Sequence, residues 1–377
     1  MENQRAKVIN RLRVTNFKSL HELDLALGNL TVLIGPNEAG KSNILDALAL
    51  LRGLMRFSLM PNIAGDPIAT RGGYRDVVWR GEHGSPITLS IEGHLGSSSP
   101  FDYTVRIELV ADYWAVTDEI LTAPPEESAH IRSSPINWNY KRASGSIDGN
   151  KLALVRIQNE SALAKQLSQT ISSWGFYNLS PALMSHANAP VSAQRLDEDG
   201  ANLSAVVHTL LSEGNPLMAT IEENVKAFSP DIEKILAPIN VSGQTYIAVR
   251  ERALPRLIPA WAMSYGTLFC LGLATALFGS DTADLLTFEE PDAYAHAHML
   301  EHIAEMLQAV TDKRQIIATT HRPYLLDYLP PDSIAIVDKV NGATSCIRAR
   351  DKKRYLKLIK ELGASKAWYS GHIGGVP

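Results

Sequence analysis

Apolar and polar residues alternate near the start of the chain, and a nearly continuous apolar run follows them. Residues 8–14 and 23–27 alternate, which predicts the two strands of a hairpin. The run Leu30–Ile34 predicts a buried strand. Beyond it, apolar residues recur at helical spacing at Ile44, Leu48, Leu51 and Met55. This part of the chain is therefore predicted to fold as strand, loop and helix.

The rest of the chain changes pattern several times. Glycine, proline and arginine punctuate residues 60–84, which is typical of loops. Strand-like runs then predict an antiparallel sheet, at 87–91, 103–110, 136–140 and 152–157. Helical spacing dominates residues 162–236 without a sustained heptad, and residues 244–249 predict one more strand. From residue 264 onward helices alternate with short apolar strands, as in a largely parallel α/β sheet: 268–278, 285–288, 299–310, 315–320 and 334–337.

The loop between the apolar strand and its helix reads Gly-Pro-Asn-Glu-Ala-Gly-Lys-Ser, a phosphate-loop spacing in its expected context. Its glycines let backbone N–H groups turn inward toward an anion, and the helix start adds a partial positive charge. Lys41 can reach the β- and γ-phosphates, and the Ser42 hydroxyl can ligate Mg²⁺. The sequence predicts that a nucleoside triphosphate, ATP or GTP, is held with Mg²⁺ by this loop: Gly35, Asn37, Glu38, Ala39, Gly40, Lys41, Ser42 and Asn43.

Composition narrows the class of protein. The 377 residues include two cysteines without metal-ligand or disulfide spacing, and the net charge of −4 gives no overall bias toward nucleic acid. The N-terminus lacks the apolar core of a signal peptide, and no apolar run is long enough to span a bilayer. We expect a cytoplasmic protein with no membrane partner.

Two adjacent carboxylates, Glu289 and Glu290, follow the apolar strand at 285–288. They are placed at the carboxyl edge of the sheet, where ligands bind in open α/β folds. One can hold Mg²⁺ as a metal ligand, and the other can orient or deprotonate the attacking water. A strand that simply ends in solvated acids is the alternative, which the phosphate loop upstream disfavours.

Residues 285–292, Leu-Leu-Thr-Phe-Glu-Glu-Pro-Asp, resemble the Walker B segment and D-loop start of ABC-type ATPases, and more narrowly those of the SMC, RecF and OLD group. The phosphate loop and residues 16–19, Asn-Phe-Lys-Ser, are similar to that group too. Residues 196–203, 368–371 and 374–377 resemble the stand-alone OLD-like predicted AAA-type ATPases, some of which serve in phage defence. The resemblance implies an α/β fold, an ABC-type P-loop NTPase head with a mixed, mainly parallel sheet, an antiparallel β portion and an α-helical insertion.

The same resemblance assigns roles. Glu289 corresponds to the acid linked to Mg²⁺, which is aspartate in transporters, and Glu290 corresponds to the catalytic base. His321 follows the strand at 315–320 and matches the catalytic switch histidine of the family.

The segment Ser264, Gly266 and Thr267 resembles the ABC signature, with Met263 in place of leucine. In the family this segment reaches the nucleotide of a partner subunit, so the resemblance implies a homodimer that sandwiches two nucleotides. Taken alone, a serine before a helix would be a plain N-cap. Its position between the two Walker motifs favours the signature.

Two features depart from simple expectations. No glutamine occupies the Q-loop region, where residues 71–76 read Arg-Gly-Gly-Tyr-Arg-Asp; either a water-mediated contact or an arginine replaces it. His298 and His302 have the spacing of a metal pair but lack the zincin pattern, so we expect interface or surface residues.

Basic residues gather toward the C-terminal end, where they predict either a solvated helix face or a contact to nucleic acid or an acidic partner: Arg348, Arg350, Lys352, Lys353, Arg354, Lys357 and Lys360.

Four parts are predicted along the chain. Residues 1–95 form the N-terminal part of the ATPase head, and residues 96–160 the antiparallel β portion. Residues 161–243 form the helical insertion. Residues 244–377 form the C-terminal part of the head, with the signature, Walker B, D-loop and switch histidine.

Two functions follow as hypotheses. The first is an Mg²⁺-dependent ATPase whose dimerisation and hydrolysis regulate a separate effector, a nuclease or toxin, in bacterial anti-phage defence. The short stretch after His321, without an acidic nuclease cluster, favours it over an OLD-type nuclease. The second is a DNA-binding ATPase like RecF or SMC, so nucleic acid stays open as a partner. A transporter subunit fits poorly.

Overall fold

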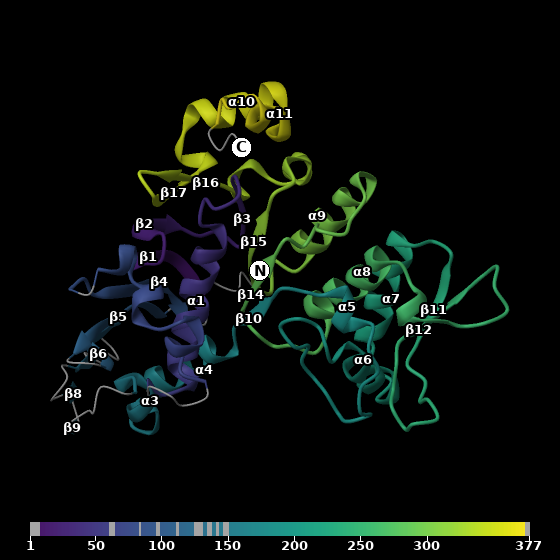
Figure 1. Cartoon of the computed structure of the whole chain (residues 1–377), viewed down its shortest axis with the longest axis horizontal. Coiled ribbons are helices and arrows are strands. Elements are labelled where there is room, and N and C mark those ends of the chain that lie inside the picture. The colour runs from purple at the N-terminus through teal and green to yellow at the C-terminus, as the bar shows by residue number, and fades with distance from the viewer. Residues whose placement is uncertain are drawn as a thin grey trace.

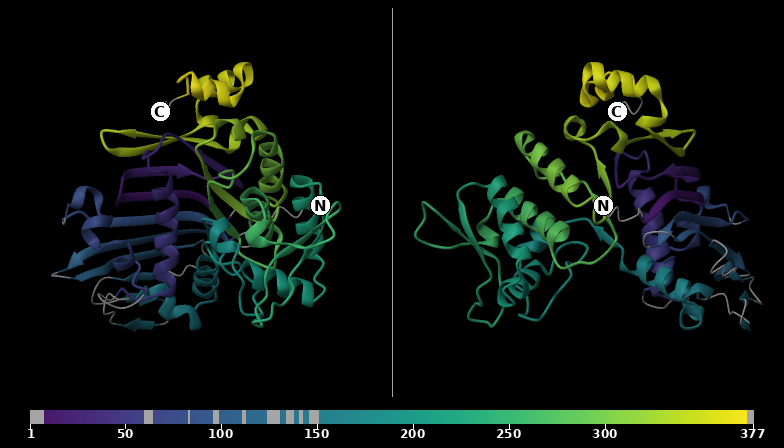
Figure 2. Two further views of the ribbon diagram at one scale, coloured as in Figure 1. Left: turned by 45° about the vertical axis from the view of Figure 1, so that its right-hand side comes forward. Right: turned by 180° about the vertical axis from the view of Figure 1, so that it is seen from behind.

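The computed structural model describes residues 8–59, 65–82, 84–95, 99–110, 113–123, 131–133, 138–140, 143–145 and 151–373. The chain forms two large sheets and one small sheet. Together with the helices that pack on them, the sheets make up two lobes (Figure 1). Seen from behind, the lobes stand on either side of a central strand region, and the C-terminal helices lie above it (Figure 2). No helix in the described part of the chain combines the length and apolarity that crossing a membrane requires.

The central sheet is mainly parallel and positions the candidate site. Its strands, in order across the sheet, are β10 (Gly175–Tyr177), β14 (Leu285–Glu289), β15 (Gln315–Thr320), β3 (Leu30–Ile34), β16 (Ile334–Val340) and β17 (Ala343–Arg348). Only β17 runs antiparallel to its neighbour. Because Glu289 pairs with Thr319 and Thr320 with Ile34, the carboxyl ends of β14, β15 and β3 meet at one edge.

Both faces of this sheet are covered, which explains its apolar strands. In β3, Leu33 belongs to one core cluster, whereas Val32 and Ile34 belong to the other. The side chains of a strand alternate between faces, so a strand buried on both sides needs apolar residues throughout.

The second large sheet is antiparallel and lies in one lobe with α1. Its strands, in order, are β2 (Leu20–Ala26), β1 (Ile9–Phe17), β4 (Ile87–Leu95), β5 (Ser99–Val110), β6 (Tyr113–Thr122), β7 (Ile131–Ser133), β8 (Trp138–Tyr140) and β9 (Ala143–Gly145). The predicted hairpin is the β1–β2 pair. Helices of this lobe are α1 (Lys41–Arg56), α2 (Tyr74–Val77), α3 (Ala153–Arg156) and α4 (Ala162–Ser173).

The other lobe is helical and carries a three-stranded sheet. Its elements are α5 (Pro181–Met184), α6 (Leu203–Ser212), α7 (Leu217–Phe228), β11 (Ile232–Leu236), β12 (Ala248–Glu251), β13 (Ile258–Pro259) and α8 (Tyr265–Phe278). Helix α8 is buried along nearly its whole length, which suits its almost wholly apolar sequence. Helix α9 (Leu300–Ala309) follows β14, and α10 (Lys353–Leu362) and α11 (Ala364–Tyr369) close the described chain.

Three sequence-based predictions about these elements need correction. Residues 152–157 are not a strand: α3 begins at Ala153, and its first two N–H groups donate to the buried Glu119 carboxylate. The strand predicted at 244–249 lies later, in β12. The stretch 162–236, predicted as helical, also contains two strands: β10, an edge strand of the parallel sheet, and β11 at its end. The strand predicted at 136–140 is described only from Trp138, because residues 136 and 137 lie outside the described residues.

Candidate nucleotide site

The phosphate-type loop is fixed by close contacts at its two glycines. Gly35 follows β3, and a Cβ at this position would lie 2.0 Å from the carbonyl oxygen of Val337. Gly40 has φ of 99° and precedes α1, and a Cβ there would lie 1.9 Å from Oγ1 of Thr344. The hydroxyl of Thr344 donates to the carbonyl of Ala39 at 2.8 Å, so β17 braces the loop. Glycine is therefore required at both positions by space, and at Gly40 by conformation as well.

Lys41 is the first residue of α1 and curls back over the loop. Its Nζ donates to the carbonyls of Gly35 and Pro36, each at 2.8 Å, and lies 3.3 Å from Nδ1 of His321. Burial lowers the pKa of Lys41 to about 8, and the nearby Glu290 carboxylate partly opposes this shift. The lysine thus places a positive charge at the helix start.

A cavity of about 270 Å³ opens in front of this helix start, lined by Asn37, Glu38, Gly40, Lys41, Ser42, Asn43 and His321. Gly40 supplies no side-chain cap to the first turn of α1, so its N–H groups remain suited to an anion. The donor set, a backbone cradle with one ammonium and one hydroxyl, fits a polyphosphate. Of the predicted nucleotide residues, buried Ala39 and Gly35 do not line this cavity and serve the loop's shape instead.

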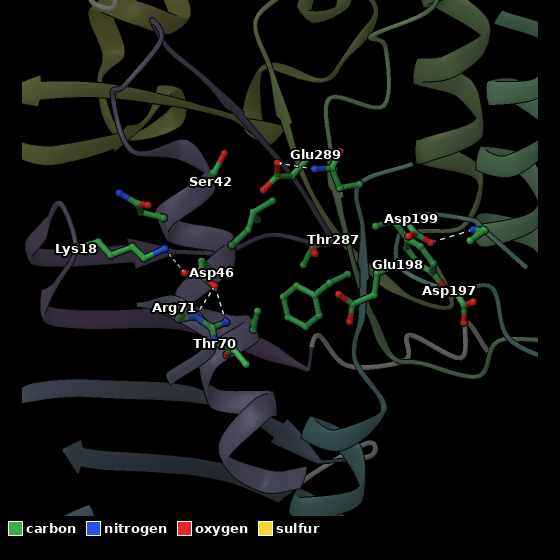
Figure 3. Close-up of a pocket in the computed structure, with 17 residues that line it drawn as sticks. Lys18, Ser42, Asp46, Thr70, Arg71, Asp197, Glu198, Asp199, Thr287 and Glu289 are labelled. Atoms are coloured by element: carbon green, nitrogen blue, oxygen red, sulfur yellow. Dashed lines mark hydrogen bonds and ion pairs between the residues drawn. The ribbon is translucent and has the colours of Figure 1, made fainter. Parts of the chain in front are cut away.

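Ser42 and Glu289 face a second, larger cavity of about 990 Å³ between the two lobes (Figure 3). Glu289 ends β14, and its Oε2 accepts a long hydrogen bond of 3.5 Å from the side chain of Asn178. Burial raises the pKa of Glu289, helped by the nearby Glu290 and Asp46, whereas a hydrogen bond with Ser42 opposes the shift. The negative charge of the Glu289 carboxylate is poorly compensated by its neighbours, and the Ser42 hydroxyl lies beside it. Such a pair of oxygen ligands fits Mg²⁺.

Glu290 and His321 lie side by side beyond the strand ends. Oε1 of Glu290 is 3.0 Å from Nε2 of His321. Glu290 has a φ of 45°, unusual for a residue other than glycine, and its N–H donates to the carbonyl of Thr319 at 3.1 Å. An ammonium only donates and a carboxylate only accepts, so a neutral His321 with its proton on Nε2 satisfies both neighbours. Burial and Lys41 lower the pKa of His321, against the effect of Glu290, which favours this neutral form.

Sequence reasoning missed an ion cluster beside Ser42. Asp46, one helical turn after Ser42, accepts from Nη2 of Arg71 at 2.6 Å and lies 2.6 Å from Nζ of Lys18 (Figure 3). Burial raises the pKa of Asp46, but its two cationic partners bring it below the usual value. Of the two replacements predicted for the Q-loop glutamine, an arginine, Arg71, does line the cavity that contains Ser42 and Glu289. Lys18 and Arg71 stand out in the sequence as parts of separate segments, 16–19 and 71–76, and no local pattern joins either of them to Asp46.

The signature-like segment lies in the other lobe. Ser264 caps α8, and its Oγ accepts from the N–H of Thr267 at 3.1 Å. Ser264 is exposed and Gly266 half-buried, and neither they nor Thr267 line the two cavities around Ser42. Within one chain, the structure does not bring this segment together with Lys41.

The remaining candidate residues are placed as follows. His296 and His298 are exposed and stack with ring centroids 5.9 Å apart, whereas Nε2 of His302 contacts the carbonyl of Asn224 at 3.0 Å. No group of three or more metal-ligating residues occurs in the described ranges. Arg348 does not belong to the predicted basic surface: it is buried, and its guanidinium donates to Oγ1 of Thr31 at 2.7 Å.

Comparisons with known proteins show what this chain is similar to. An OLD nuclease from Thermus scotoductus is 50% identical over 46 residues, which cover 12% of this chain and 9% of that nuclease. The chain thus matches only a small part of the length of this curated relative.

Two solved structures share the fold. The crystal structure of an SmcHead bound to the C-winged helix domain of ScpA is 16% identical, with a TM-score of 0.59, and the match covers 90% of this chain and 97% of that one. An Smc head domain with an extended coiled coil, bound to the C-terminal domain of ScpA derived from Pyrococcus furiosus, is 15% identical, with a TM-score of 0.50, and covers 94% and 100%. The predicted α/β fold class, a head with a mixed, mainly parallel sheet and an antiparallel β portion, is confirmed, and the fold is that of SMC head domains.

A family match covers most of the chain, including the phosphate-type loop, both lobes and His321. The chain belongs to the family described as "AAA domain, putative AbiEii toxin, Type IV TA system", which matches residues 30–327.

Proposed function

We propose that this chain is an Mg²⁺-dependent ATP hydrolase that works as a homodimer. The observation that carries the proposal is the row Lys41–His321–Glu290 at the carboxyl ends of three adjacent strands. It joins a phosphate-binding lysine to a carboxylate that can act as a base. Family membership and the SMC-head fold support an ATPase.

Each residue has a defined task in this proposal. The loop from Gly35 to Asn43 binds the phosphates, with Lys41 at the β- and γ-phosphates. Ser42 and Glu289 hold Mg²⁺, which when bound neutralises phosphate charge. Oε1 of Glu290 accepts a proton from the attacking water, and Nε2–H of His321 keeps that carboxylate in place. Lys41 donates to the carbonyls of Gly35 and Pro36, and in this proposal its ammonium turns to the phosphates when nucleotide binds.

A second copy completes the site. Ser264, Gly266 and Thr267 lie at the start of α8, away from the cavity in front of Lys41. A serine hydroxyl and N–H groups at a helix start form an anion site, so we propose that they reach the nucleotide of a head-to-tail partner. The predicted domain boundaries at 95, 160 and 243 belong to this proposal as well.

The biological output that we propose is control of a separate effector, a nuclease or toxin, in cytoplasmic anti-phage defence. The family description names a toxin and a TA system, and a 46-residue segment matches an OLD nuclease, which supports an effector of the toxin or nuclease kind. SMC heads bind ScpA domains in the similar structures, which supports a protein partner for a head of this fold.

A DNA-binding role like that of RecF or SMC is the second candidate. The observation that favours it is the basic surface of α10, where Lys353, Arg354, Lys357 and Lys360 are exposed. Lys357 lies 3.7 Å from Glu361, a weak exposed pair that leaves most of the charge available for phosphates.

Two variants test the hydrolase. Glu290→Gln should bind ATP, form a stable dimer and lower turnover at least about 100-fold, because only the base is lost. Lys41→Ala should lose tight ATP binding by calorimetry and stay monomeric with ATP. Wild-type turnover in Glu290→Gln would contradict the base assignment, and unchanged ATP affinity in Lys41→Ala would contradict the nucleotide site.

The output is tested by a pull-down from the native host with Glu290→Gln and ATP, and with Lys41→Ala as the matched control. A specific protein retained only by the first variant supports the effector proposal. Nuclease-sensitive retention of DNA alone supports the DNA-binding role instead.

A further inference from the structure

Arg322, the residue after His321, holds the segment that follows the two glutamates. Its Nη1 donates to the carbonyl of Ala295 and its Nη2 to the carbonyl of Ala293, each at 2.6 Å. One guanidinium thus fixes two carbonyls that are two residues apart. Bidentate contacts of this kind specify geometry, because the donor fork is rigid.

A second tie joins the same two segments. Asp292 is buried, and its Oδ2 accepts from the hydroxyl of Thr320 at 2.7 Å. The same hydroxyl oxygen accepts from the N–H of Arg322 at 2.9 Å. Residues 292–295, which we call the clamp segment, therefore cannot shift without disturbing the residues on both sides of His321.

The clamp segment also touches the start of α8. The ring of Tyr294 lies 5.1 Å from the ring of Phe269 and 6.1 Å from that of Tyr265. A Cβ at Gly266 would lie 3.1 Å from the carbonyl oxygen of Tyr294, so the signature-like turn rests directly on the clamp backbone. These contacts form a continuous path from His321, through Arg322 and Tyr294, to Gly266 and Ser264.

We infer that Arg322 is a positioning residue: through the clamp segment it holds in place the signature-like segment that the same chain presents to its partner's site. The inference rests on the proposed function. It deepens that function by naming the residue, next to His321, that fixes the signature-like segment for the partner's nucleotide. Arg322 itself lines neither cavity around Ser42, so its effect must pass through the clamp segment.

Mixed dimers test this path. One chain carries Lys41→Ala, so its own site cannot hold nucleotide. The other chain carries Ser264→Arg, so its signature-like segment cannot contact the nucleotide of its partner. Each variant alone should be inactive, and an equimolar mixture should regain turnover at one composite site. Arg322→Ala is then added to one chain at a time, and kcat and KM for ATP are measured.

The Lys41→Ala chain holds no nucleotide and contributes only its signature-like segment, with Ser264, to the composite site. When Arg322→Ala is added to this chain, kcat should fall at least about tenfold. KM should change less than kcat. If Arg322 merely supports its own His321, only the nucleotide-holding chain is sensitive, and the inference is overturned. If the mixture regains no activity at all without Arg322→Ala, the dimer proposal fails instead.

Two controls guard against misfolding. Tyr294→Ala in the donating chain should reproduce the loss, whereas Tyr294→Phe, which keeps the ring contacts, should retain activity. Arg106→Ala, on the exposed face of β5, removes an arginine far from the path and should leave kcat unchanged. Equal losses in Tyr294→Ala and Tyr294→Phe would contradict the ring contact as a link.

Discussion

His321 bridges Glu290 and Lys41: its Nε2 lies 3.0 Å from the Glu290 carboxylate, and its Nδ1 lies 3.3 Å from the Lys41 ammonium. An imidazole that accepts at one nitrogen and donates at the other transmits a change at the lysine to the carboxylate. Under the proposed function Lys41 turns toward a phosphate, and Nδ1 then loses its donor. The proposal therefore implies that the orientation of Glu290 responds to nucleotide occupancy through one ring.

This bridge predicts that His321 and Glu290 do not act independently. His321→Ala and Glu290→Gln should each lower turnover about 100-fold or more. The double variant should be no slower than the slower single variant, because both substitutions disable one unit. Single-turnover ATP hydrolysis measures all three. Losses that multiply would contradict the bridge.

The site was predictable where it depends on local sequence. The loop from Gly35 to Ser42 and the glutamates after β14 are set by short stretches whose spacing defines their geometry. The parallel sheet followed from alternating helices and apolar strands.

Features that depend on distant contacts were not predictable. Residues 152–157 are apolar enough for a strand, but the buried Glu119 carboxylate caps α3 and fixes a helix. Arg348 has the composition of a surface residue, yet Thr31 and the carbonyl of Ala26 accept its hydrogen bonds inside the fold. Asp46 and Arg71 come from elements 25 residues apart in the chain, so no local pattern pairs them.

Asp46 restrains two cations beside Ser42 and Glu289, which we propose hold Mg²⁺, so Asp46→Asn should strengthen ATP binding at low salt. Without the carboxylate, Arg71 and Lys18 raise the positive potential near Ser42, and the gain should vanish in high salt. The loss of a buried ion-pair partner should also lower stability by about 1–3 kcal/mol. ATP titrations at two salt concentrations and thermal unfolding measure both effects. Asp24→Asn, the same charge change on β2, is the control, and equal effects in both variants would contradict the prediction.

Glu119 should make the fold more stable in mild acid. Burial raises its pKa to about 7, in spite of hydrogen bonds from Tyr103, Ala153 and Leu154. The folded chain therefore binds a proton that the unfolded chain has released between about pH 4.5 and 7, so this contribution to the free energy of unfolding falls as pH rises across that window. The loss amounts to up to about 3 kcal/mol. Denaturant unfolding measures the free energy of unfolding of wild type and of Glu119→Gln at several pH values. The two curves of free energy against pH should converge or cross between about pH 4.5 and 7. Parallel curves would contradict the raised pKa of Glu119.

Lys41 should have the opposite dependence at alkaline pH. Its pKa in the folded chain is about 8, below the value of 10.5 for an unperturbed lysine, because burial disfavours the ammonium. The unfolded chain then binds more protons between about pH 8 and 10.5, so the nucleotide-free protein gains stability from this group as pH rises. Lys41→Met lacks the titrating group but keeps a similar chain length.

The unfolding temperature of wild type minus that of Lys41→Met should rise from pH 8 to pH 10 without ATP. The same rise should shrink with Mg²⁺ and ATP present, because phosphate contacts favour the charged lysine. A flat difference without nucleotide would contradict the lowered pKa.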